Sequence, residues 1–148
     1  MRTHIDLNAL IEAFGDAIIV ADTAGIITLW NPAAVRMFGY TEAEALGQSL
    51  DIIIPERMRQ RHWEGYVKTM ETGVTKYGHD ILRVPAIGKD GKNLSIAFTV
   101  ALLHDGDGKV NAIASIMRDE TERFHKDRAT RKRLDELERL VRSSAAVS

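Results

Sequence analysis

The segment from Pro55 to Gly73 carries the residues whose types and spacing are best suited to chemistry. It predicts one amphipathic helix with Pro55 in its first turn and Thr72-Gly73 at its end. Met58, His62 and Tyr66 recur every four residues, so on an α-helix they share one face. Gly65 falls on the same face and would let a bulky group approach. A neutral imidazole in an apolar interior is a ready ligand for iron, and it equally suits a core histidine that bonds a backbone carbonyl. The spacing leaves both interpretations open.

The rest of the chain contains no second group of residues with the types and spacing of a catalytic or metal-binding site. Cysteine is absent, which excludes disulfides, thiolate metal ligands and thiol nucleophiles. No Ser–His–Asp grouping, carboxylate pair or phosphate-binding glycine loop can be argued from spacing, so we expect no enzyme activity. The other histidines are scattered without the spacing of a metal site, and we expect them on the surface: His4, His79, His104 and His125.

Composition limits the remaining classes. The 148 residues, of which 45% are hydrophobic and 28% charged, suit one globular domain plus an accessory segment. Twenty Lys and Arg against 21 Asp and Glu give a net charge of −1, which argues against nucleic acid as a partner. No apolar run is long enough to span a membrane and the first residues lack a secretory core, so we expect a cytoplasmic location.

A sheet and several short helices must position the long helix. Two β-branched runs, over residues 17–21 and 26–30, flank the turn-forming residues 22–25 and predict a hairpin. Asn31 then supplies an N-cap and Pro32 the first position of a short helix, and a second short helix follows with a capping box.

The second half of the chain reads as three strands. Residues 77–87 look extended, and Pro85 within them indicates an edge strand because proline cannot donate to a ladder. Residues 94–102 alternate between a bulky apolar face and a small face flat enough to be covered by a helix. Residues 110–117 form the last strand.

Both ends of the chain are predicted to be helical. Leu7, Leu10, Ile11 and Phe14 form one apolar stripe, which needs a partner surface on its own sheet or on a second subunit. From Arg118 onward the sequence is helical and highly charged, with a seam suited at best to a short, weak coiled coil.

The motifs along the chain occur in a familiar order: Asp22, Gly25, Trp30, Asn31, Pro32, Ala33, Ala34, Phe38, Gly39, Tyr40, Gly47, Lys89, Asp90, Gly91, Arg118, Asp119, Glu120 and Thr121. With the order of elements, they resemble a PAS domain over roughly residues 6–122. The resemblance implies an α+β fold, a five-stranded antiparallel sheet with helices on one face. We therefore expect an amphipathic cap helix over residues 1–15, the PAS domain over 16–119, and a signalling helix over 120–148 whose end, Ser143–Ser148, is frayed.

Within that family the chain is similar to haem-binding domains of the FixL oxygen-sensor type. There the long helix carries a proximal histidine twelve residues, counted inclusively, from a terminal Thr-Gly, and His62 to Gly73 has that spacing. The resemblance therefore implies a b-type haem whose iron is held by His62, with Met58 and Tyr66 beside it.

The same resemblance places the distal side of such a site on the strands. The position of the arginine that steadies bound dioxygen falls on Leu82, while Arg83 should point to the opposite face. The implied distal pocket would favour a neutral gas or a vacant site over a strongly polarised dioxygen complex. It consists of Leu82, Ile96, Phe98 and Val100.

We expect a sensory module of a bacterial-type signal-transduction protein, binding a small ligand or cofactor. The most specific version of this expectation is a module that binds haem and senses a gas or a redox state. A homodimer would signal through residues 120–142 to an output domain or partner protein. The alternative is a cofactor-free module, in which the pocket is filled by the domain's own side chains. Its role would be dimerisation through the helix over residues 7–14 and the small face of the sheet.

Overall fold

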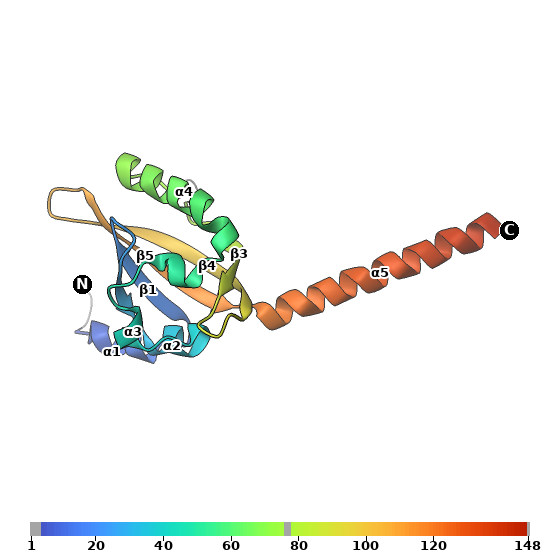
Figure 1. Ribbon diagram of the computed structural model, residues 1–148, viewed down its shortest axis with the longest axis horizontal. Helices are drawn as coiled ribbons and strands as arrows, with labels where there is room; N and C mark the ends of the chain where they lie inside the picture. The colour runs from blue at the N-terminus through green and yellow to red at the C-terminus, as the bar shows by residue number, and fades with distance from the viewer. Residues whose placement is uncertain (1–3, 76–77, 148) are drawn as a thin grey trace.

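The computed structural model describes residues 4–75 and 78–147. Its centre is a five-stranded antiparallel sheet in the order β2-β1-β5-β4-β3, which confirms the predicted α+β fold (Figure 1). The strands are β1 Ala17–Asp22, β2 Ile27–Trp30, β3 Leu82–Ile87, β4 Asn93–His104 and β5 Val110–Asp119. The edge position of β3 confirms the interpretation of Pro85. The extended run predicted from residue 77 begins only at Leu82, and Tyr77 lies outside the described residues.

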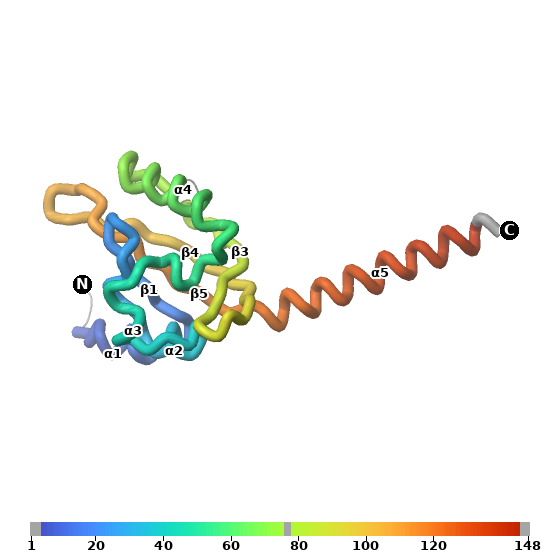
Figure 2. The backbone as a smooth tube through the Cα atoms, in the orientation of Figure 1, coloured from blue at the N-terminus to red at the C-terminus, as the bar shows by residue number. Residues whose placement is uncertain are grey.

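Helices fill the segment between β2 and β3 and lie over one face of the sheet (Figure 2). They are α2 Pro32–Phe38, α3 Glu42–Ala45, the 3-10 turns η1 Leu50–Ile53 and η2 Glu56–Met58, and α4 Arg59–Thr72. The remaining helices are α1 Leu7–Ala13 and α5 Thr121–Val147. None of the helices in the described ranges combines the length and hydrophobicity that crossing a membrane requires.

Side-chain caps fix the short helices where the sequence predicted them. The Asn31 side chain accepts from the backbone N–H of Ala34 at the start of α2, and Gly39 closes that helix in the left-handed region. Thr41 and Glu44 form a reciprocal capping box on α3. These local bonds satisfy backbone groups that a helix end leaves unpaired, so short helices become stable at defined positions.

The long helix differs from the prediction at its start. Residues 56–58 form the 3-10 turn η2, and the α-helix begins only at Arg59. Pro55 therefore precedes a tight turn and does not occupy the first turn of α4. The end is as predicted, because Gly73 has φ +69° and terminates the helix.

The two faces of the sheet have different characters. In β4, Leu94 and Ile96 point inward and are buried, while Ala101 on the other face is exposed. Leu82 of β3 lies opposite Phe98 of β4, which lies opposite Met117 of β5, so these three share the inward face. The outward face has small or polar residues over much of β4 and β5, and in the described chain no helix packs on it closely enough to bury Ile116, which is 45% exposed.

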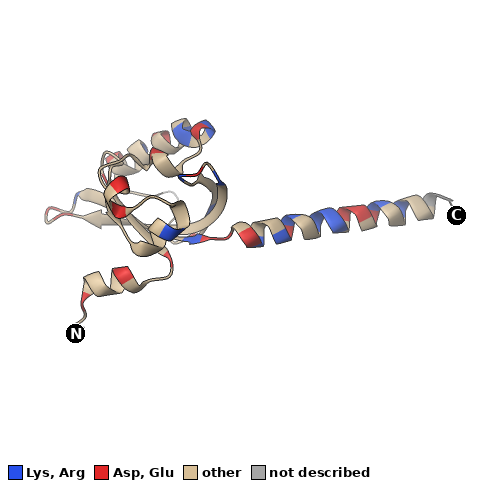
Figure 3. Cartoon of the chain, turned by 60° about the horizontal axis from the view of Figure 1, so that its bottom comes forward, with Lys and Arg blue, Asp and Glu red and all other residues tan. Residues whose placement is uncertain are grey.

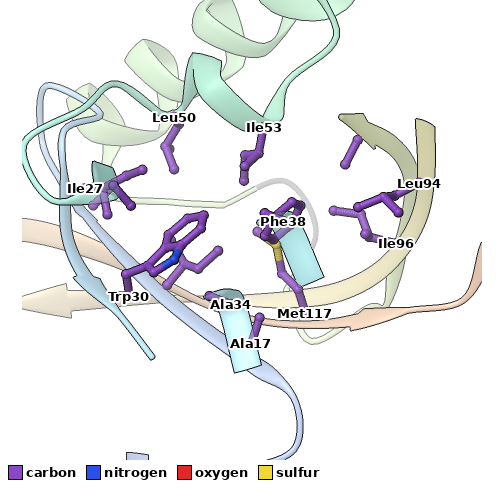
Figure 4. Close-up of a cluster of buried hydrophobic side chains, with 14 of the residues drawn as sticks. Ala17, Ile27, Trp30, Ala34, Phe38, Leu50, Ile53, Leu94, Ile96 and Met117 are labelled. Carbon is purple, nitrogen blue, oxygen red and sulfur yellow. The ribbon is translucent and has the colours of Figure 1, made fainter. Parts of the chain in front are cut away.

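The hydrophobic core lies between the sheet and the helices around α2 (Figure 4). Trp30 and Phe38 stack with ring centroids 5.6 Å apart, and the Trp30 indole donates to the Tyr40 carbonyl at 3.0 Å. Both side chains are at most 2% exposed, so they lie fully inside the core. The α4 end contributes one fully buried residue, Tyr66.

Both terminal helices expose apolar side chains. In α1, Leu7 and Leu10 are 64% and 44% exposed, and Phe14, directly after the helix, is 41% exposed. Helix α5 projects away from the domain as a single rod (Figure 3). It is helical through Val147, and Ser148 lies outside the described residues. The fraying expected from Ser143 stays a prediction.

Candidate functional site

The inner face of α4 carries a cluster of three ring side chains. His62 contacts Trp63 edge-on at 4.6 Å between ring centroids, and Tyr66 lies 5.7 Å from His62 and 5.1 Å from Trp63. Trp63, Tyr66 and Met70 follow an i, i+3, i+7 pattern, and Trp63 and Met70 pack against the core cluster to which Tyr66 belongs. His62 therefore lies at the margin of the inward stripe, half-buried.

Gly65 does not belong to that stripe, which corrects the prediction. It is exposed, and a Cβ added to it would meet nothing within 4 Å. The stripe is rotated because Trp63, one residue after His62 and about 100° further round the helix, faces the domain. Met58, the third residue of the predicted stripe, is half-buried in the turn η2 just before the helix.

A glycine on the β1–β2 turn receives the Trp63 ring. A Cβ built on Gly25 would lie 2.1 Å from Cη2 and 2.3 Å from Cζ3 of Trp63, so the indole rests directly on the glycine backbone. The Trp63 Nε1 donates to the Asp51 carboxylate at 2.7 Å. We call Gly25, Trp63 and Asp51 the α4 latch, since they fix the helix to the turn and to η1.

Tyr66 adds a second tie to the same turn. Its hydroxyl donates to the backbone carbonyl of Asp22. Burial, with the nearby Asp22 charge, raises the pKa of Tyr66 to about 12. The phenol therefore remains a neutral donor at physiological pH and holds the middle of α4 on the hairpin.

His62 is the member of the cluster whose ring nitrogen could bind a ligand. Its Nδ1 is buried and has no hydrogen-bond partner among the residues that the structure describes. Burial lowers the pKa of His62, an effect that the Asp51 charge partly opposes, so the imidazole is neutral at pH 7. A buried polar atom without a partner costs about 1–3 kcal/mol, and in native proteins such atoms often mark a functional site.

Four strand residues predicted for the site share the inward face of the sheet: Leu82, Ile96, Phe98 and Val100. Ile96 is buried in the core and Phe98 packs against it. Among the described residues, Leu82 and Val100 stay outside the core cluster and are half-exposed although they point inward. Apolar side chains on an inward face are thus left partly uncovered on the β3–β4 side.

Arg83 points to the opposite face, as the alternation of the strand predicted. Its Cα pairs with that of Ala97, and its Nε lies 3.4 Å from a carboxylate oxygen of Glu120. Its guanidinium therefore lies on the other side of the sheet from Leu82. Two shallow hollows of about 280 and 220 Å³ also lie on the outward face and share Thr99 and Ile116.

The α4 latch is the part of the site that sequence reasoning missed. The turn chemistry around Gly25 was visible, and its φ of +81° fits that chemistry. The sequence held no signal that pairs Gly25 with Trp63, 38 positions later. No cluster of three or more His, Asp or Glu residues suited to a metal ion occurs in the residues that the structure describes.

Comparison with known proteins places this geometry in context. A family model described as "PAS fold" matches residues 5–119. The sensor protein FixL of Bradyrhizobium diazoefficiens is 42% identical over 71 residues, covering 48% of this chain and 14% of FixL. The histidine protein kinase AtoS of Escherichia coli is 28% identical over 140 residues, covering 95% of this chain and 21% of AtoS. The chain thus spans about a fifth or less of these relatives' length.

A solved structure has the same fold over most of the chain. The crystal structure of a domain from Colwellia psychrerythraea superimposes with a TM-score of 0.69 at 21% identity. The match covers 78% of this chain and 95% of that domain. At this level of identity the likeness concerns the fold alone.

Proposed function

Because the chain belongs to the PAS family, whose domains are sensory modules of signal-transduction proteins, we propose that it binds a small ligand or cofactor between α4 and the sheet. On this proposal residues 16–119 form the sensory domain, residues 1–15 a cap helix, and residues 120–142 carry the signal to an output domain or partner.

The observation that carries this proposal is the half-buried, neutral His62, whose Nδ1 finds no partner within the described ranges. Among the ligands that a PAS site can take we propose b-type haem, since iron binds a neutral imidazole. The residues are compatible with the group: His62 would hold the iron, and the half-exposed apolar side chains of Leu82 and Val100 would gain cover from a porphyrin. Bound haem would supply an iron that binds gases or changes redox state.

The residues on the strands bear on which signal would be sensed. Leu82, Phe98 and Val100 offer no hydrogen-bond donor to a diatomic ligand. A polar dioxygen complex gains most from such a donor, so this distal side favours a neutral gas or a vacant position. Tyr66 cannot provide the donor while its hydroxyl is bonded to the Asp22 carbonyl.

Haemin titration of the purified protein tests the ligand assignment. We expect a saturable Soret band at one haemin per chain for the wild type and for His125→Ala, which removes an exposed histidine from α5. We expect His62→Ala to lose the band or to shift it to that of free haemin. A spectrum that His62→Ala leaves unchanged would refute the assignment.

A second function, assembly without a cofactor, is favoured by a different observation. The apolar stripe of α1 and the outward sheet face around Ile116 are both exposed in one chain. Such surfaces are matched by a second copy, which would give the homodimer. Leu10→Glu should then convert a dimer to a monomer in sedimentation, whereas Glu12→Gln on the same helix should not. A wild-type monomer at high micromolar concentration would exclude this function.

A further inference from the structure

The position of α5 depends on a small junction at its first residues. The helix projects from the sheet, and its residues 122–145 are exposed apart from the half-buried Glu136 (Figure 1). No core packing therefore fixes its direction. The contacts that do so are made by the residues at the end of β5 and the start of α5.

Glu120 is the centre of that junction. Its backbone N–H donates to the Ser95 carbonyl at 2.8 Å, and its carbonyl accepts from the Phe124 N–H at 2.8 Å, which starts the helical ladder. The Ser95 N–H donates to the Thr121 hydroxyl at 3.0 Å. These bonds join the start of α5 to the backbone of β4. They do not by themselves fix the direction of α5, because the helix can still rotate about the segment at Glu120 and Thr121.

The Glu120 side chain adds a contact to the neighbouring strand. Its carboxylate, only 18% exposed, lies 3.4 Å from Arg83 Nε of β3 and 3.9 Å from Arg123 of α5. Glu120 thus links the edge strand of the sheet to the first turn of the helix. Among the ion pairs of the described residues, Arg83–Glu120 is the one that connects β3 to this junction.

Strand β3 is suited to transmit a displacement. It is an edge strand with a single neighbour, and Pro85 removes a ladder donor from it. Successive residues of a strand face opposite sides, so Leu82 points toward the proposed ligand and Arg83 toward Glu120. A ligand that pushes Leu82 therefore also moves the guanidinium that holds the junction.

We propose that Arg83 is the residue that positions the output helix, converting a displacement of β3 at Leu82 into a change in the direction of α5. The inference rests on the proposed ligand site for its physiological trigger. Its test needs no ligand, because a larger side chain at Leu82 can impose the same displacement.

A second ion pair provides a matched control. Arg118 donates to the Asp16 carboxylate through Nε and Nη2, both at 3.1 Å, close to the same junction. This pair joins β5 to the segment before β1 and bypasses β3. Asp16→Asn should therefore weaken an Arg–carboxylate pair of the same type without interrupting the route from Leu82.

The experiment measures the distance between two nitroxide labels by pulsed electron paramagnetic resonance. The native chain has no cysteine, so Gln48→Cys on the domain and Lys132→Cys on α5 can be labelled cleanly, diluted with unlabelled protein. Lys132 lies 12 residues beyond Glu120, about 18 Å along a helix, so a tilt of about 10° moves the label by about 3 Å.

We expect Leu82→Trp to shift the distance distribution by about 3 Å or more in the otherwise wild-type protein and in Asp16→Asn. The shift should vanish in Arg83→Gln and in Glu120→Gln, which keep the strand and the backbone bonds. A shift that survives both substitutions, or no shift with Leu82→Trp in folded protein, would overturn the proposal. A failed haemin titration with an intact distance response would reject haem and leave the role of Arg83 standing.

Discussion

Substitution of Gly25 by alanine probes the α4 latch, the contact that fixes the helix carrying His62. The added methyl would overlap the Trp63 ring at 2.1 Å, so the indole must leave its place. The backbone at Gly25 also has φ +81°, which an alanine adopts only with strain. Two separate costs therefore arise from one substitution.

The magnitude follows from these two costs. A left-handed conformation costs a non-glycine residue about 1–2 kcal/mol. Displacing Trp63 removes its hydrogen bond to the Asp51 carboxylate, and a bond to a charged group is worth about 1.5–3 kcal/mol. We therefore expect Gly25→Ala to lower the free energy of unfolding by about 2.5–5 kcal/mol.

Gly47 provides the matched control. It has φ +84° but nothing within 4 Å of an added Cβ, so Gly47→Ala carries the strain alone. In urea unfolding followed by circular dichroism, the two variants should differ by about 1.5–3 kcal/mol. The native fluorescence of Trp63 should change only in Gly25→Ala. Equal destabilisation of both variants, with unchanged indole emission, would refute the latch.

Three further predictions concern bonds inside the domain. Asn31→Ala should lower the free energy of unfolding in urea by about 3 kcal/mol. The buried amide of Asn31 accepts from the N–H groups of Ile18 and Ala34 and donates to the carbonyls of Ile11 and Asp16. A loss below about 1 kcal/mol would contradict this. Hydrogen bonds from Lys89 and the Thr41 N–H lower the pKa of Glu44 to about 2, so the stability that this carboxylate contributes is present above pH 4.5 and lost as pH falls toward 2. Nuclear magnetic resonance titration should show the Glu44 pKa rising in Lys89→Ala, and an unchanged value would exclude the pairing. Because the pKa of Tyr66 is raised to about 12, one tyrosine should ionise well above pH 10 by ultraviolet absorbance, and Tyr66→Phe should remove that step.

Local signals in the sequence were enough to predict most of the elements. Asn31 as a cap, the Thr41–Glu44 box and Gly73 as a terminator each act within a few residues, so their physical effect is visible without the fold. Pro85 likewise predicted the edge strand, because a missing donor is a property of one residue.

The details of the site depended on contacts that no local pattern contains. Spacing from His62 predicted a stripe through Gly65, but packing of Trp63 on Gly25 rotates the helix away from that arrangement. The junction between Arg83 and Glu120 joins residues 37 positions apart and was not predicted either. The facing direction of Arg83 was predicted correctly, since it follows from strand alternation alone.

The state of the His62 ring tests the central claim most directly, and imidazole ¹H–¹⁵N spectra at pH 6.5 measure it before and after haemin is added. We predict that His62 is predominantly neutral at this pH, and that haemin broadens its ring signals while those of the exposed His104 and His125 stay unchanged. A His62 ring that is protonated at this pH and unaffected by haemin would contradict a neutral imidazole available as a ligand at this position.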